Sequence, residues 1–397
     1  MGLLEQTKSI LREYRDWWQL PKEAKQEDRI DRAGLPEADP GIDACVQASI
    51  DWLLNSQKMS TTTDGGSSRH FSLIDGWGSS YPETTGYIVP TLIDYAKRSQ
   101  RSDVMESARK MADWLVSIQF EEGGFQGGLV DALPRVQVTF NTGQILMGLS
   151  AAAAEWGEPY RASMNRAATW LVETQDSDGC WRKYPTPFAA PGEKVYETHV
   201  AWGVFEAARV EGSEAYADAA FANVRWAMTH QRDNGWMAEC CLTDPDYPLT
   251  HTLGYCLRGL VEANRYRSDP EVLASAMKLA KGLQSAIHEN GHLPGCLDSE
   301  WKGAVDWVCL TGSVQIAHSF LLLAQATGDD SLADAGFRLN QFVRRTVRVD
   351  GEEGVRGGVK GSFPVSGGYG HFQYLNWAAK FMIDSNLLES DMRTNAG

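Results

Sequence analysis

The sequence predicts an all-α fold, an (α/α)6 toroid in which six helical hairpins close into a ring. Two observations support this prediction. An acidic or amide residue followed by glycine recurs six times, and the glycines are 56 to 60 residues apart: Gly65, Gly123, Gly179, Gly235, Gly291 and Gly351. An amphipathic helical pattern precedes each pair, and a nearly apolar one follows it. A fixed period of this kind is the signature of a repeated supersecondary unit.

The segment before each glycine is predicted to be an outer helix of the ring. Apolar residues recur there at three- and four-residue spacing, as on one face of an amphipathic helix. In four copies the segment ends with a tryptophan and a glutamine: Trp52 and Gln57, Trp114 and Gln119, Trp170 and Gln175, Trp226 and Gln231. The glycine that follows is expected to supply a left-handed C-cap.

The segments that follow the glycines are predicted to be inner helices. Residues 145–154, 201–208 and 316–324 are almost entirely apolar, and a helix that is apolar on every side is buried. Six outer and six inner helices are enough for a closed double layer. An open solenoid of stacked helix pairs is the alternative, but its terminal repeats are expected to be more polar.

The repeats place the toroid at residues 41–390, preceded by an N-terminal helical extension and linker at residues 1–40. The extension contains Trp17 and Trp18; it is expected to pack on the ring, and a helix lying on a membrane surface is the alternative. No run of 18 apolar residues is present, so no integral membrane segment is expected. The net charge of −15 disfavours nucleic acid as a partner. Seven cysteines without an export signal indicate reduced thiols in a cytoplasmic protein.

Residues 166–181, which read RAATWLVETQDSDGCW, resemble the QW repeat of triterpene cyclases, a repeat shared more loosely with the β subunits of protein prenyltransferases. The resemblance implies an α/α toroid and a structural role for the glutamine and the aromatic residue, which tie neighbouring outer helices together. It makes an isoprenoid cyclase or prenyltransferase-like enzyme one alternative for the function. The D-x-D-D acid motif of the cyclases is missing from this chain.

The prenyltransferase resemblance also raises the question of zinc, which those enzymes hold with Asp, Cys and His. Asp306, Cys309 and His371 are the residues that this chain offers. Cys309 and His371 are 62 positions apart, but any two equivalent positions in adjacent repeats are separated by about 60 residues. A buried cysteine and a hydrogen-bonded histidine explain them equally well. The prediction is therefore that no metal and no other cofactor is bound.

The starts of the six inner helices are expected to converge on one mouth, where polar residues interrupt the apolar pattern. Carboxylates beside aromatic faces and amides are typical of a sugar site, and a glycosidase needs two carboxylates facing one bond. The sequence therefore predicts an enzyme that cleaves a glycosidic bond in a glycan, with Glu83, Glu197 and Asp306 as acid/base candidates. The predicted substrate-binding residues are Tyr81, Arg135, Asn141, Gln144, Tyr196, His199, Trp202, Trp307, Gln315, His371, Asn376 and Trp377.

A polysaccharide lyase or sugar epimerase is a second interpretation of the same mouth. His251 and Tyr255 are four residues apart and share one helix face, so they can act as a base and acid pair, with Arg135 as the accompanying cation. A non-catalytic binding protein or scaffold is the third interpretation, since the fold alone does not select a function. The oligomeric state is left open by the sequence.

Overall fold

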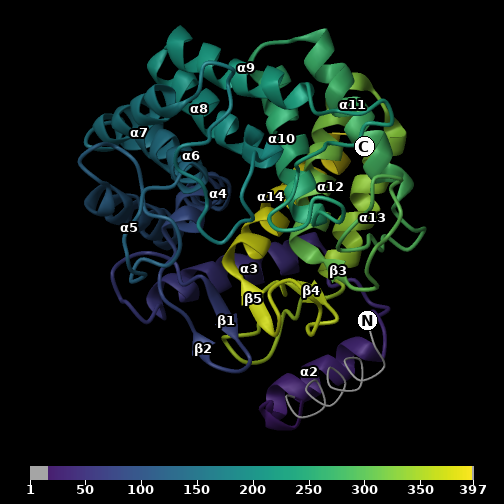
Figure 1. The fold of residues 1–397 in the computed structure, drawn as a ribbon. Helices are drawn as coiled ribbons and strands as arrows, with labels where there is room; N and C mark the ends of the chain where they lie inside the picture. Colours follow the sequence, from purple (N-terminus) through teal and green to yellow (C-terminus); the bar gives the residue numbers. More distant parts are fainter. Residues whose placement is uncertain (1–16, 396–397) are drawn as a thin grey trace, which may run out of the picture.

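A computed structural model describes residues 17–395, and Figure 1 shows its helices arranged in two concentric rings. The inner helices are α4 (Pro82–Ser99), α6 (Thr139–Trp156), α8 (Thr198–Glu211), α10 (Thr250–Tyr266), α12 (Leu310–Thr327) and α14 (Asn376–Asn395). The outer helices are α3 (Ile42–Lys58), α5 (Ser102–Ile118), α7 (Tyr160–Thr174), α9 (Glu214–Met228), α11 (Pro270–Ser285) and α13 (Asp330–Arg344). This arrangement confirms the predicted all-α toroid.

The ring is closed rather than open. Each inner helix packs against the next one along the chain, and α14 returns to contact α4. The junction is also joined by strands, because β1 (His70–Ser72) pairs on one side with β2 (Gly76–Trp77) and on the other with β5 (Gln373–Leu375). Residues about 300 positions apart in the sequence therefore lie side by side, which closes the ring within the described part of the chain.

The hairpin unit differs from the predicted one in its order. An inner helix and the outer helix that follows it are joined by a short turn, as at α4 and α5, and they pack closely. The loops from an outer helix to the next inner helix are long. The first outer helix, α3, packs against the last inner helix, α14, so the sixth hairpin is assembled from both ends of the chain.

Glycine permits the close approach of neighbouring inner helices. A Cβ added at Gly148 of α6 would lie 2.2 Å from the carbonyl oxygen of Gly86 on α4. A Cβ at Gly203 of α8 would lie 2.1 Å from the carbonyl oxygen of Gly143 on α6. Both distances are far below van der Waals contact, so a larger residue would force the helices apart. Neighbouring inner helices can lie this close because glycine has no side chain.

The recurring glycines lie in turns after the outer helices, not at their C-caps as predicted. Helix α7 ends at Thr174, and Gly179 follows in a turn with φ of 94°. A Cβ on Gly179 would lie 2.4 Å from the carbonyl oxygen of Ala222 on the next outer helix. The positive φ was expected, but the close approach to the neighbouring repeat is an additional reason for glycine.

The glutamines of the repeat connect neighbouring outer helices, as the resemblance implied. The Nε2 of Gln175 donates to the carbonyl oxygens of Gly179, at 3.0 Å, and of Ala219 on α9, also at 3.0 Å. Gln57, Gln119 and Gln231 make the corresponding pairs of bonds in their own repeats. The glutamine therefore fixes a turn and the next outer helix at once.

Replacing Gln175 with alanine should lower the free energy of unfolding by about 1–3 kcal/mol, because two backbone carbonyls lose a donor in a half-buried position. The urea midpoint of the variant should fall while its circular dichroism at 222 nm stays the same. Gln26→Ala, at an exposed position of helix α2 (Lys22–Arg32), is the matched control. An unchanged midpoint in Gln175→Ala would contradict the bridging role.

The N-terminal part of the chain packs on the ring at the glycine-rich segment 351–370. Helix α2 lies below the ring in Figure 1, and its Glu27 and Asp31 carboxylates contact Lys360 at 2.6 and 2.5 Å. Residues 1–16 of the predicted extension lie outside the described residues. Two strands, β3 (Val308–Cys309) and β4 (Ser362–Phe363), hold the glycine-rich segment against α12.

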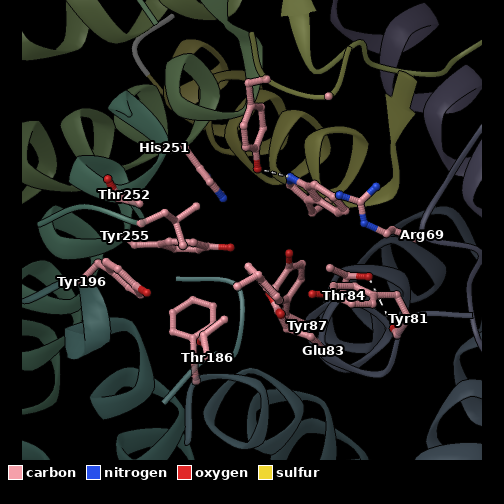
Figure 2. Close-up of a pocket in the computed structure, with 16 residues that line it drawn as sticks. Arg69, Tyr81, Glu83, Thr84, Tyr87, Thr186, Tyr196, His251, Thr252 and Tyr255 are labelled. Carbon is pink, nitrogen blue, oxygen red and sulfur yellow. Dashed lines mark hydrogen bonds between the residues drawn. The ribbon is translucent and has the colours of Figure 1, made fainter. Parts of the chain in front are cut away.

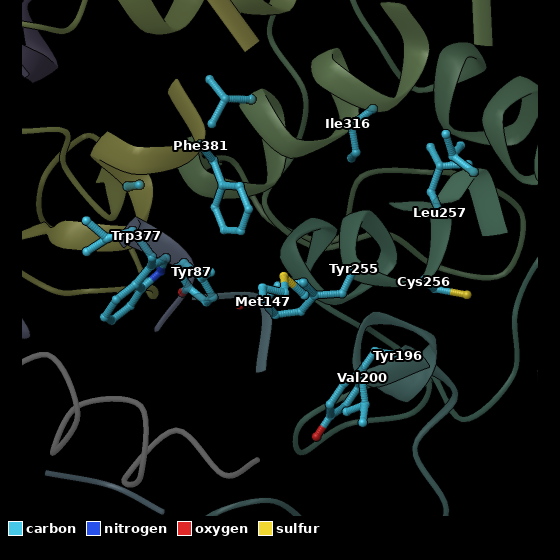
Figure 3. Packing of buried hydrophobic residues seen from close by; sticks show 14 of the residues in the cluster. Tyr87, Met147, Tyr196, Val200, Tyr255, Cys256, Leu257, Ile316, Trp377 and Phe381 are labelled. Atoms are coloured by element: carbon cyan, nitrogen blue, oxygen red, sulfur yellow. The ribbon is translucent and has the colours of Figure 1, made fainter. Parts of the chain in front are cut away.

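The hydrophobic core fills the space between and inside the two rings. Figure 3 shows side chains from several inner helices meeting in the interior, among them Tyr87, Met147, Val200, Ile316 and Phe381. All seven cysteines are unpaired. Among the residues that the structure describes, no helix is both long and apolar enough to cross a membrane.

Candidate functional site

A pocket opens at the end of the ring where the inner helices begin, as Figure 2 shows. The cavity itself is about 130 Å³, and the space is about 660 Å³ when the part open to solvent is counted. The lining comes from α4, α6, the turn before α8, α10, α14 and the loops between them: Arg69, Tyr81, Glu83, Thr84, Tyr87, Phe140, Thr186, Phe188, Tyr196, Leu242, His251, Thr252, Tyr255, Tyr369, Gly370 and Trp377.

Glu83 supplies the carboxyl group of the pocket. It lies in the first turn of α4, is only 7% exposed, and its Oε2 accepts a hydrogen bond from Asn141 Nδ2 at 3.0 Å. Burial raises the pKa of Glu83 to about 7, although the Tyr81 hydroxyl and the charge of Arg69 oppose the shift. A carboxyl group with a pKa near neutrality can both donate and accept a proton, as general acid/base catalysis requires.

His251 supplies a neutral imidazole whose orientation is held by Gln315. Its Nδ1 lies 2.7 Å from Oε1 of Gln315, an acceptor that suits the tautomer with the proton on Nδ1. Burial lowers the pKa of His251 to about 4, although the bond to Gln315 opposes the shift. The Nε2 lone pair is therefore free to act as a base, and Figure 2 shows the ring directed into the pocket.

Tyr255 forms the floor of the pocket between two histidines. Its ring centroid is 4.3 Å from that of His251 and 4.3 Å from that of His199. The two histidines are held in the same way, since His199 Nδ1 is 2.6 Å from Oε1 of Gln144. Burial, and then the charges of Lys380, Arg258 and His251, keep the pKa of His199 well below its usual value. Tyr255 therefore lies between two neutral imidazoles.

Aromatic rings form much of the pocket wall. Trp377 donates a hydrogen bond from Nε1 to the Tyr369 hydroxyl at 2.9 Å. Phe140 packs edge-on against Tyr196, with 5.3 Å between ring centroids. Phe188 is 57% exposed although it lines the pocket, so it presents an apolar face at the rim. Flat apolar faces beside polar groups suit the alternating C–H and hydroxyl surfaces of a sugar ring.

The structure brings eleven of the seventeen predicted residues together at or under this pocket. Glu83, His251, Tyr255, Tyr81, Tyr196 and Trp377 line it directly. Asn141, Gln144, His199, Trp202 and Gln315 form a layer behind these residues, where they contact Glu83, His251, Tyr255 or one another.

The other six predicted residues do not line the pocket. Asp306 and His371 are exposed, and Arg135 lies on the surface with its Nε bonded to Gln126 Oε1. Trp307 packs on glycines of the 367–368 segment, and Asn376 donates to Ser67 and Ser68.

Glu197 is the sixth residue that does not line the pocket, and the local backbone explains its position. It lies in a 3-10 turn, η1 (Val195–Glu197), that precedes α8 and places Tyr196 in the pocket instead. Its Oε2 is buried without a hydrogen-bond partner, and burial raises its pKa to about 8. Within residues 17–395, Glu83 is therefore the one carboxyl group that lines the pocket.

The zinc alternative finds no support in the geometry. Asp306 is exposed while Cys309 is buried. Among the described residues no group of three or more His, Cys, Asp or Glu side chains is arranged to hold a metal ion.

Sequence reasoning missed Arg69 and Tyr87. Tyr87 is four residues after Glu83 on α4, so the two side chains share one helix face. The same four-residue rule that predicts His251 and Tyr255 together therefore predicts Tyr87 beside Glu83. Arg69 precedes strand β1 in a loop of irregular length, where no periodicity predicts the direction of a side chain. Only the pairing of β1 with β5 brings Arg69 to the mouth.

Three solved structures with the same fold are described by their names as sugar-processing enzymes. One is described as an unsaturated glucuronyl hydrolase specific for heparin; it has a TM-score of 0.72 and 14% identity, and the match covers 90% of this chain and 99% of that one. A cellobiose 2-epimerase from Bacillus thermoamylovorans has a TM-score of 0.67 and 10% identity, covering 87% and 99%. A D-mannose isomerase has a TM-score of 0.68 and 11% identity, covering 90% and 100%.

These similarities show the fold alone, an α/α toroid. No protein-family model matches the chain, and the search of curated proteins finds no match. The QW-type resemblance is thus not confirmed by a family model.

Proposed function

We propose that this protein is a sugar-processing enzyme that removes a proton from a carbon next to a carbonyl or carboxyl group, with His251 as the base and Glu83 as the acid. The observation that carries the proposal is the hydrogen bond between His251 Nδ1 and Gln315 Oε1, which leaves Nε2 for the ligand in a pocket where Glu83 is the one carboxyl group among the described residues. This is the chemistry of an epimerase, an isomerase or a lyase.

The step balances within the pocket. The C–H bond breaks and its proton goes to His251 Nε2, while the electron pair moves to the neighbouring oxygen, which accepts a hydrogen bond or proton from Glu83. Return of a proton to the carbon gives an epimer or isomer, and loss of a group from the next carbon gives an unsaturated sugar. The Tyr255 hydroxyl, at the floor beside His251, is a second proton donor of the site.

Hydrolysis by two carboxylates, the first expectation from the sequence, receives less support. It needs a second carboxyl group about 5–9.5 Å from the first, and Glu197 and Asp306 do not line the pocket. The raised pKa of Glu83 would suit a general acid, so hydrolysis is kept as an outcome of the test.

Isotope labelling separates these reactions. The protein would be incubated in D₂O and in H₂¹⁸O with D-mannose, cellobiose and an unsaturated uronate disaccharide from heparin, with heat-denatured protein as the control for spontaneous exchange. Deuterium on a sugar carbon, or a new absorbance in the near ultraviolet, would support the proposal. ¹⁸O at a newly released anomeric carbon without deuterium would replace it with hydrolysis. No change on any of these sugars would count against both.

A further inference from the structure

Arg69 is the one residue, among the described residues that line the pocket, whose side chain is charged at every ordinary pH. The pocket also contains the Glu83 carboxyl group, whose pKa burial raises to about 7, and the His251 imidazole, whose pKa burial lowers to about 4. Neighbouring His70 is also neutral, because burial and the charge of Arg69 lower its pKa to about 4. A pocket with one fixed cation and a partly protonated carboxyl group favours an anion.

The Arg69 side chain is held firmly, but it is not neutralised. Its guanidinium carbon lies 5.0 Å from the ring centroid of Trp377 and 6.0 Å from that of Tyr81. Its Nη1 donates to Gln373 Oε1 at 3.0 Å and faces His70 Nδ1 at 3.1 Å. No carboxylate of residues 17–395 forms an ion pair with it. In contrast, Arg182 has three acidic partners and Arg344 has two.

One edge of the guanidinium is left for a ligand. Every side-chain hydrogen bond of Arg69 within the described part of the chain involves Nη1, so Nε and Nη2 keep their donors. These two nitrogens form the fork that binds a carboxylate through two parallel hydrogen bonds. Figure 2 shows the side chain at the pocket wall, on the same side as Tyr81 and across the cavity from Tyr196.

We propose that the pocket binds a sugar carrying a carboxylate, that is, a uronic acid, and that the Nε–Nη2 edge of Arg69 receives this carboxylate. The inference rests on the proposed function, because it takes the ligand to be a sugar. It also adds a reason for the chemistry. A carboxylate paired with a cation withdraws electrons more strongly, so the adjacent C–H becomes more acidic and His251 can remove its proton more easily.

Binding measurements test the inference without requiring turnover. Ligand-observed NMR titrations would compare D-glucuronate, its neutral amide D-glucuronamide, D-glucose and D-glucose 6-sulfate. The wild-type protein should bind glucuronate about tenfold or more tightly than glucuronamide, the effect of one lost charge-assisted interaction. Arg69→Gln should remove this preference and leave glucuronamide binding unchanged, which also shows that the pocket is intact.

Two further variants sharpen the comparison. Arg69→Lys keeps the charge but not the fork, so it should retain only part of the preference. Arg29→Gln, at an exposed arginine of α2, is the matched control and should bind like wild type. Equal binding of glucuronate and glucuronamide by the wild type would overturn the inference. So would glucose 6-sulfate that binds as tightly as glucuronate, since that would indicate a general anion site.

The binding test of Arg69 and the deuterium-exchange test of the proposed function can give different answers. Glucuronate binding through Arg69 without deuterium exchange would uphold the inference and reject the proton-transfer reaction. Deuterium exchange on neutral sugars that is unaffected in Arg69→Gln would do the reverse.

Discussion

Replacing His251 with asparagine should reduce the rate of deuterium incorporation from D₂O by about 10²–10⁴-fold while leaving the fold intact, because the variant lacks the base that accepts the proton. Asparagine can still donate a hydrogen bond towards Gln315 Oε1, so the buried amide keeps a partner. The effect should appear in kcat rather than in KM, since the imidazole acts on the reacting bond. Exchange rates followed by NMR give both constants.

The pH profile provides a second readout of the same residue. His251 acts as a base only when neutral, so activity should rise as the pH passes through about 4. Glu83 acts as an acid only when protonated, so activity should fall as the pH passes through about 7. Gln315→Glu would place a carboxylate beside Nδ1 and stabilise the imidazolium, which should move the acidic limb to higher pH.

His288→Asn is the matched control for the His251 variant. His288 is exposed on the turn after α11, outside the residues that line the pocket, so the variant should keep the wild-type rate and pH profile. A His251→Asn protein that exchanges deuterium as fast as wild type, with normal circular dichroism, would exclude His251 as the base.

The fold could be predicted because it depends on repeated local features. The glycine turns, the outer glutamines and the apolar inner helices recur with one period, and each has a steric or hydrogen-bonding cause that acts within a repeat or between neighbours. Gln175 illustrates this, since the bonds it makes to Gly179 and Ala219 are repeated by three other glutamines. What the period did not reveal was that α3 pairs with α14, a contact between the two ends of the chain.

The site could be predicted only where a regular helix carries the side chain. His251 and Tyr255 follow from their four-residue spacing on α10, and Glu83 from its place at the start of α4. Glu197 does not, because the 3-10 turn before α8 changes which side chain faces inwards. Arg69 does not either, because its position is set by strand pairing between distant segments. The spacing of residues along the sequence predicts neither the 3-10 turn nor the strand pairing.

Replacing Lys360 with methionine should release helix α2 from the ring, at a cost of about 3–5 kcal/mol, because the buried Asp31 carboxylate loses its cation and Glu27 keeps only Arg348, at 3.5 Å. Lys360 is 3% exposed, and its Nζ contacts Glu27 at 2.6 Å and Asp31 at 2.5 Å. Asp31 also accepts a hydrogen bond from the backbone N–H of Val365 at 2.7 Å. Hydrogen exchange of α2 should accelerate, and proteases should cut in residues 33–41.

The release should also reach the pocket, because Lys360 and Val365 belong to the segment that carries Tyr369 and Gly370 to the pocket wall. A less firmly held wall should raise the dissociation constant of a pocket ligand in Lys360→Met.

Adding Glu27→Gln and Asp31→Asn removes the charges that Lys360 had paired, so the triple variant should recover part of the protection of α2 against hydrogen exchange. Lys22→Met, at an exposed lysine of the same helix, should behave as wild type. If α2 in Lys360→Met keeps wild-type exchange rates, the ion pairs of Lys360 do not hold it. Its attachment then rests on its other contacts, such as the bond of Val365 N–H to Asp31 and the packing of Ala24 on Val365 and Phe372.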